Sequence, residues 1–61
     1  MQKGIYTVSA SKADGIYVYR THSLALAEGK AGELVQPGVI VTIWRGNVGS
    51  NVIAQYIKEG N

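Results

Sequence analysis

The sequence predicts a single small α+β domain with the element order β-β-α-β-β, in which one helix packs on an antiparallel sheet. Four segments hold branched and aromatic residues at the two-residue period of strands, and a segment between them holds alanine and leucine at helical spacing. Glycine and proline separate these segments. Because 61 residues are too few for two hydrophobic cores, residues 1–61 are expected to form one domain.

The first two strands, at 5–10 and 16–21, are predicted to form a hairpin. Asp14 and Gly15 lie between them and are typical of a short loop, because aspartate bonds its own backbone and glycine adopts positive φ. The alternation of side chains along a strand sets the faces: Tyr6, Val8 and Ala10 share one face of the first strand, and Tyr17 and Tyr19 share one face of the second.

A helix is predicted over residues 23–35, with Ser23 as the N-cap that accepts a free backbone N–H of the first turn. Gly29 and Gly32 lie inside this helix, although each glycine costs roughly 1 kcal/mol against alanine in a helix interior. We interpret them as positions where the helix closely approaches the sheet or another helix, with a bend in the helix as the alternative.

The third and fourth strands are predicted at 39–45 and 52–58. Pro37 and Gly38 precede the third strand and match the two central positions of a type II turn. Residues 46–51 are rich in glycine and predict a turn between the two strands, although their Gly-x-x-Gly spacing also occurs in loops that clamp a nucleic-acid backbone. The order of the strands in the sheet stays open, because this sequence of elements admits several arrangements.

The residue types do not favour an enzyme, and no metal or cofactor site is expected. The chain has no cysteine and one histidine, His22, so it lacks a thiol nucleophile and a set of nitrogen and sulfur ligands for a metal. Ser23 follows this histidine, but helix capping already explains it. The net charge of +2 comes from scattered basic residues and does not demand a nucleic-acid partner.

No membrane association is expected either. The apolar runs of the chain, among them the one at 39–41, are far too short to span a bilayer. The first four residues are not followed by the apolar stretch of a signal peptide, so a cytoplasmic location is expected.

The strands carry more apolar surface than one helix can cover. If the helix covers a face with Ile16, Val18, Val39, Val41 and Ile43, the opposite face holds Tyr17, Tyr19, Ile40 and Trp44. The last strand adds either Ile53 and Ile57 or Tyr56 to that opposite face. Such a patch is larger than soluble monomers usually expose, so we expect it to be covered. A second copy could cover it or extend the sheet edge, the sheet could curl into a partly closed barrel, or another macromolecule could bind there.

One stretch of the chain resembles a known group of proteins. Tyr19 to Arg45 comprises a strand, a short alanine-rich helix, a Pro-Gly turn and then Val41-Thr42 ahead of the arginine. In length and element order the chain is similar to small phage-encoded host-takeover proteins, among them an inhibitor of the host RNA polymerase. The resemblance implies a small accessory protein that acts by binding a larger one.

The predicted function is that of a small non-enzymatic interaction protein, homodimeric, which binds a protein partner through an apolar and aromatic sheet face. The residues expected to contact the partner are Tyr17, Tyr19, Ile40 and Trp44. The alternative is a weak nucleic-acid-binding module, in which aromatic side chains flanked by arginines stack on bases. Its expected residues are Tyr17, Tyr19, Trp44, Arg20 and Arg45.

Overall fold

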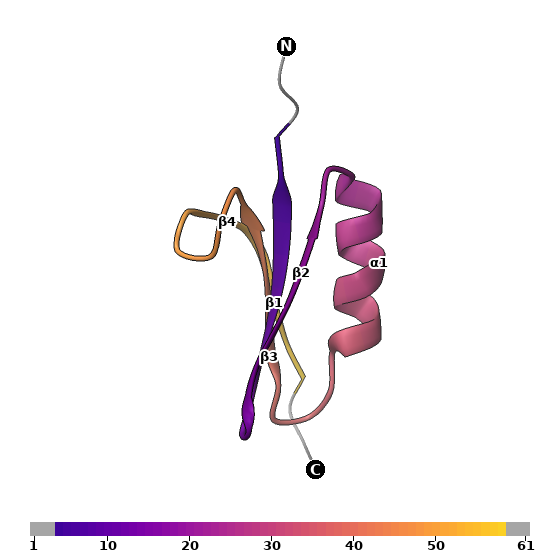
Figure 1. Ribbon diagram of the computed structural model, residues 1–61. Helices are drawn as coiled ribbons and strands as arrows, with labels where there is room; N and C mark the ends of the chain where they lie inside the picture. Colours follow the sequence, from indigo (N-terminus) through magenta and orange to yellow (C-terminus); the bar gives the residue numbers. More distant parts are fainter. Residues whose placement is uncertain (1–3, 59–61) are drawn as a thin grey trace.

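The structure is a computed structural model that describes residues 4–58, and it confirms the predicted α+β fold class and element order (Figure 1). The elements are β1 (Tyr6–Lys12), β2 (Gly15–Thr21), α1 (Leu24–Leu34), β3 (Ile40–Arg45) and β4 (Asn51–Ile57). The first hairpin departs most from the expected bounds, because its strands run up to a loop of only two residues, Ala13 and Asp14.

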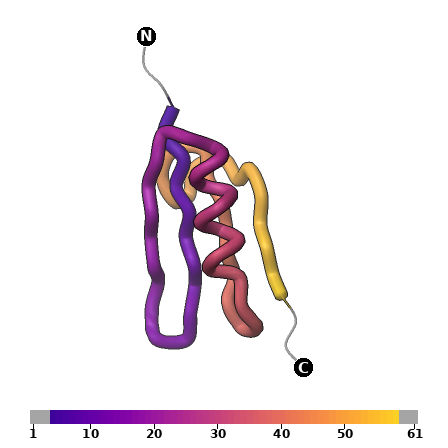
Figure 2. The backbone as a smooth tube through the Cα atoms, turned by 90° about the vertical axis from the view of Figure 1, so that its right-hand side faces the viewer, coloured from indigo at the N-terminus to yellow at the C-terminus, as the bar shows by residue number. Residues whose placement is uncertain are grey.

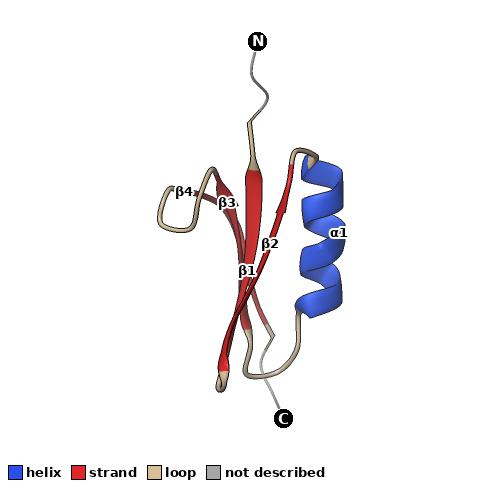
Figure 3. Cartoon of the chain, in the orientation of Figure 1, coloured by secondary structure: helices blue, strands red, loops and turns tan. Residues whose placement is uncertain are grey.

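The four strands form one sheet in the order β2-β1-β3-β4, and every neighbouring pair is antiparallel. β2 and β3 therefore run parallel to each other on either side of β1, and α1 connects them by crossing over β1 (Figure 2). This crossover packs the helix on β1, β2 and β3, so Val8 and Ala10 of β1 are buried beneath it. The helix lies on one face of the sheet only (Figure 3).

The helix begins and ends where the sequence predicts, within one residue. Ser23 is its N-cap, and the Ser23 hydroxyl accepts the backbone N–H of Leu26 at 3.2 Å. Val35 is the C-cap, and its N–H donates to the Ala31 carbonyl at 3.1 Å. These contacts satisfy backbone groups that a helix terminus leaves unpaired.

Two turns follow, and glycines adopt positive φ in both. Between α1 and β3 the Val39 N–H donates to the Gln36 carbonyl at 3.1 Å, and Gly38 has a φ of 82°, as a type II turn requires. Between β3 and β4, Gly46 has a φ of 101° and Gly49 a φ of 97°. The glycines at 46–51 thus belong to a turn between strands, as predicted.

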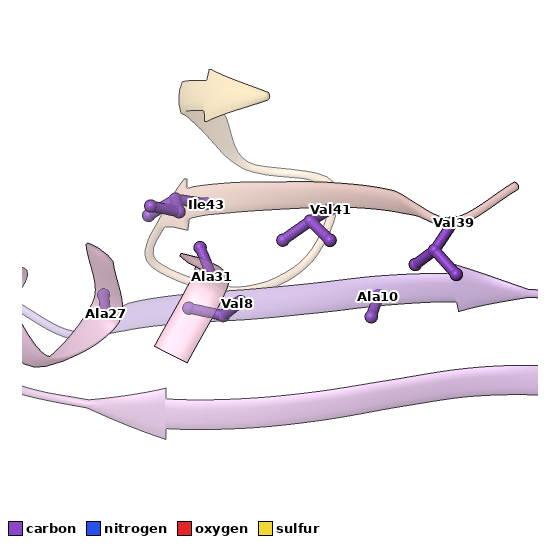
Figure 4. Close-up of a cluster of buried hydrophobic side chains, with 7 residues drawn as sticks. All are labelled: Val8, Ala10, Ala27, Ala31, Val39, Val41 and Ile43. Carbon is purple, nitrogen blue, oxygen red and sulfur yellow. The ribbon is translucent and has the colours of Figure 1, made fainter. Parts of the chain in front are cut away.

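The core lies between α1 and the sheet and is built from small and branched side chains (Figure 4). Its buried members are Val8, Ala10, Ala27, Ala31, Val39, Val41 and Ile43. Ala27 and Ala31 are one helical turn apart and are the buried residues of α1, so the helix approaches the sheet through methyl groups.

The two helical glycines do not take part in this contact. Gly29 and Gly32 are exposed, and a Cβ built on either one meets no atom of the described residues within 4 Å outside the local helix backbone. The interpretation of these glycines as positions of close approach is therefore wrong, because two alanines make the contact instead.

The strand faces also differ from the expected arrangement. Val8 pairs with both Tyr19 and Ile43, and Ala10 pairs with both Tyr17 and Val41. Residues directly opposite each other in a sheet share a face, so both tyrosines lie on the helix side. The expected grouping of these tyrosines with Ile40 and Trp44 on the face opposite the helix is wrong, because the two-residue hairpin loop sets a register that carries Ile16 and Val18 to that face instead.

The sheet is open rather than closed. β2 and β4 are its two edges, and no ladder joins them in the part of the chain that the structure describes. The partly closed barrel is therefore wrong for residues 4–58.

Candidate interaction surface

The face of the sheet opposite the helix, which we call the open face, is the main candidate surface. Strand pairing assigns twelve residues to it: Thr7, Ser9 and Ser11 of β1; Ile16, Val18 and Arg20 of β2; Ile40, Thr42 and Trp44 of β3; and Val52, Gln55 and Ile57 of β4. Ile53 is the extra residue of a β-bulge, since Ile43 pairs with Ala54 whereas Trp44 pairs with Val52.

A stripe of hydroxyl side chains from β1 divides this face along its length. The Thr7 hydroxyl is buried and donates to the Gly46 carbonyl in the β3–β4 turn. The Ser9 hydroxyl accepts the indole N–H of Trp44 at 2.9 Å, so the tryptophan side chain reaches from β3 to β1. In the described residues, no buried side-chain polar atom lacks a partner. The polar stripe is therefore satisfied within the domain, which removes the usual penalty for buried polar groups.

Large aliphatic side chains flank the stripe and are exposed. On β3 and β4, Ile40 is 43% exposed, Val52 54% and Ile57 63%. On β2, Ile16 and Val18 are exposed on the same face. One row runs across the whole sheet, from Ile16 through Ser11 and Ile40 to Ile57. The apolar excess expected from the sequence therefore exists and lies on both edges of the open face.

The four residues predicted to contact a protein partner are split between the two faces. Ile40 and Trp44 lie on the open face, whereas Tyr17 and Tyr19 lie on the helix side. Tyr19 is covered by the helix, because the Lys30 Nζ lies 5.1 Å from the centre of its ring. That lysine also pairs with Glu33 of the helix at 3.5 Å. The tyrosine ring thus has an intramolecular cation partner.

The five residues of the nucleic-acid alternative are split in the same way. Arg20 and Trp44 lie on the open face and both pair with Thr7, so they belong to one cross-strand row. Arg45 pairs with Tyr6 and lies on the helix side with the two tyrosines. The stacking platform of three neighbouring aromatic rings is therefore not assembled on one face, and Trp44 is the aromatic residue of the open face.

Sequence reasoning missed three aliphatic members of the open face, namely Ile16, Val18 and Val52, whereas Ile57 lies beside Ile40 as one of its two alternatives for the last strand expected. The hairpin loop was the signal that could have placed the β2 pair. With Ala13 and Asp14 as the loop, Lys12 opposes Gly15, and counting outward places Val18 opposite Ser9.

Within residues 4–58 there is no pocket, and no three histidine, aspartate or glutamate side chains gather to hold a metal ion. His22 is exposed at the turn before the helix. None of the described residues belongs to a helix long and apolar enough to cross a membrane. No family model, curated protein or solved structure matches this chain.

Proposed function

We propose that this chain is a non-enzymatic protein-binding domain and that the open face of its sheet is the contact surface. The observation that carries the proposal is the set of exposed aliphatic side chains on both sides of the hydroxyl stripe, on a face without a covering layer: Ile16, Val18, Ile40, Val52 and Ile57. Monomeric proteins rarely leave large apolar patches in water unless another molecule contacts them.

The chemistry of the face favours a protein as the partner. Arg20 is its charged residue, and the other eleven residues are aliphatic, hydroxyl, amide or indole side chains. The core of a protein interface is similarly depleted in charge. Burying a half-exposed isoleucine such as Ile40 contributes roughly 1 kcal/mol, so several of them together supply a useful affinity.

Trp44 is suited to the centre of such a contact. Its indole N–H already donates to Ser9, so a partner can cover the ring without leaving a buried donor unpaired. Tryptophan is also enriched among the residues that carry most of the energy of protein interfaces. The resemblance of the stretch from Tyr19 to Arg45 to phage host-takeover proteins is a further argument for a protein partner.

The test uses two neighbouring positions that face opposite ways. Val18 is 41% exposed on the open face, and Tyr17 is 40% exposed on the helix side. A photo-crosslinking benzophenone residue is placed at one position or the other, and adducts are analysed by mass after illumination in the native cells. We expect adducts with a second protein from position 18 and few from position 17.

Three outcomes contradict the proposal: no adduct from position 18, equal adducts from both positions, or adducts from position 18 that contain only a second copy of this chain. The nucleic-acid alternative is tested by titrating the fluorescence of Trp44 with single-stranded oligonucleotides. That alternative requires quenching and an affinity that falls steeply with salt, whereas the protein-binding proposal expects neither.

A further inference from the structure

The outer edge of β4 is a strand edge without the usual protection. β4 is the last strand of the sheet, so one side of its backbone has no neighbouring strand among the described residues. The segment Asn51–Ile57 contains no charged residue and no proline, which are the common devices that prevent pairing with another chain. Its residues are exposed except for Ala54, which is half-buried.

The other edge strand is better protected. β2 contacts the helix, and its exposed Arg20 is a charged residue within the edge. β4, in contrast, lies to the side of the helix (Figure 2). On its helix side Tyr56 is 38% exposed. Both faces of β4 are therefore accessible, and the strand ends where Lys58 makes an isolated parallel bridge with Pro37.

We propose that this edge pairs with β4 of a second copy of the chain, in antiparallel orientation, to form a continuous eight-stranded sheet. A two-fold axis perpendicular to the sheet relates the two copies, because only that axis reverses the strand direction while joining the same edges. Both helices then lie on one side, and the two open faces become one continuous surface. The proposal concerns a different surface from the proposed function, and neither rests on the other.

The charge pattern of the strand favours a second copy as the partner. A symmetric pairing opposes a strand to itself, so any charge within it meets a like charge or lies near one. Asn51–Ile57 holds no charge, and Lys58 lies just beyond the end of β4. A standard stable interface takes about 800 Å² from each partner, and an edge of seven residues or fewer supplies less, so the dimer is expected to be weak and concentration-dependent.

The bulge at Ile53 defines where the copies meet. A bulge interrupts the regular alternation, so regular pairing is confined to the part of β4 from Ala54 onward. Directly opposed residues must face the same way across the axis. Gln55 and Ile57 lie on the open face, so three registers fit: Gln55 opposes Gln55 of the second copy, Gln55 opposes Ile57, or Ile57 opposes Ile57.

The test is the double substitution Gln55→Lys with Ile57→Lys, since each of the three registers then opposes at least one lysine to a lysine of the second copy. The matched control is Ile16→Lys with Val18→Lys, which adds the same charge to the same face at the opposite edge. Molar mass is measured by light scattering over a concentration series. We expect a wild-type dimer at high concentration, at least tenfold weaker self-association in the β4 variant, and an unchanged dimer in the β2 variant.

A monomeric wild type at every concentration overturns the proposal. Equal loss of the dimer in both variants also overturns it, because that result indicates contact through the open face rather than the β4 edge. Hydrogen exchange on the wild-type chain gives a measurement that does not depend on the variants folding. Protection of backbone amides in Ala54–Ile57 should rise with protein concentration, whereas that of β2 amides should not.

Discussion

Thr7 joins the start of β1 to the turn between β3 and β4. Its buried hydroxyl donates to the Gly46 carbonyl, and the Gly46 N–H donates to the Ile5 carbonyl at 2.7 Å. The two contacts use both backbone groups of Gly46, its N–H and its carbonyl, and they hold the turn against the start of β1. A hydroxyl on a buried strand position is therefore a structural requirement in this sheet rather than a misplaced surface residue.

The first prediction follows from this hydrogen bond. Thr7→Val keeps the shape of the side chain but leaves the Gly46 carbonyl without its hydroxyl donor, so the free energy of unfolding should fall by about 1–2 kcal/mol. Urea denaturation followed by the fluorescence of Trp44, the single tryptophan, measures the change.

Thr7→Ser is the control, because it retains the donor and loses only a methyl group. The free energy of unfolding of the serine variant should remain closer to that of the wild type than the value for the valine variant does. A valine variant as stable as the wild type would show that the hydroxyl contributes nothing to the turn.

At the scale of elements, the helix carries two glycines that its packing does not use. Gly29 and Gly32 are exposed and have room for a methyl group, whereas Ala27 and Ala31 contact the sheet. Neither glycine has a positive φ. Both positions therefore lower helix stability without a compensating contact in the single chain.

The second prediction is that Gly29→Ala and Gly32→Ala each raise the free energy of unfolding by about 0.5–1 kcal/mol. The gain comes from the smaller conformational freedom of alanine in the unfolded chain. Thermal or urea unfolding followed by circular dichroism at the helix band measures it.

Gly38→Ala makes the same chemical change at a turn position whose φ is 82°, so it should destabilise the domain. A rise in the free energy of unfolding for the helical variants and a fall for Gly38→Ala would support the conclusion that the turn requires its glycine whereas the helix does not. A loss of stability at Gly29 would indicate that another surface approaches the helix there.

The elements themselves were predictable, whereas the pairing of their faces was not. Strand alternation, Ser23 as the N-cap and the Pro-Gly turn are local signals, and all of them are present in the structure. The faces depend on register, and a shift of one residue in the hairpin moves Tyr17 and Tyr19 from one side of the sheet to the other. The turn-forming residues from 11 to 15 did not show which two of them form the loop.

At the scale of the whole molecule, the order β2-β1-β3-β4 determines what is covered. The helix must travel from the end of β2 to the start of β3, and β1 lies between these strands. The helix therefore covers the β1 region, and β4 receives no comparable cover (Figure 2). No local signal in the sequence specifies that β1 is central, which explains why the sequence left the strand order open.

The last prediction concerns the stability of the assembled molecule. If β4 pairs with β4 of a second copy, unfolding requires dissociation, so the unfolding midpoint depends on protein concentration. Above the dissociation constant, a hundredfold rise in concentration stabilises each chain by about 1.4 kcal/mol. For a domain of this size the midpoint temperature should rise by roughly 5–10 °C.

Thermal unfolding of the wild type across that concentration range, followed by circular dichroism, measures the shift. The unfolding midpoint of the variant with Gln55→Lys and Ile57→Lys should depend less on concentration than that of the wild type, because its β4 edges repel each other. The variant with Ile16→Lys and Val18→Lys should keep the wild-type dependence. A midpoint that is independent of concentration in all three proteins means that the domain unfolds as a monomer, and the accessible edge of β4 then needs a different strand as its partner.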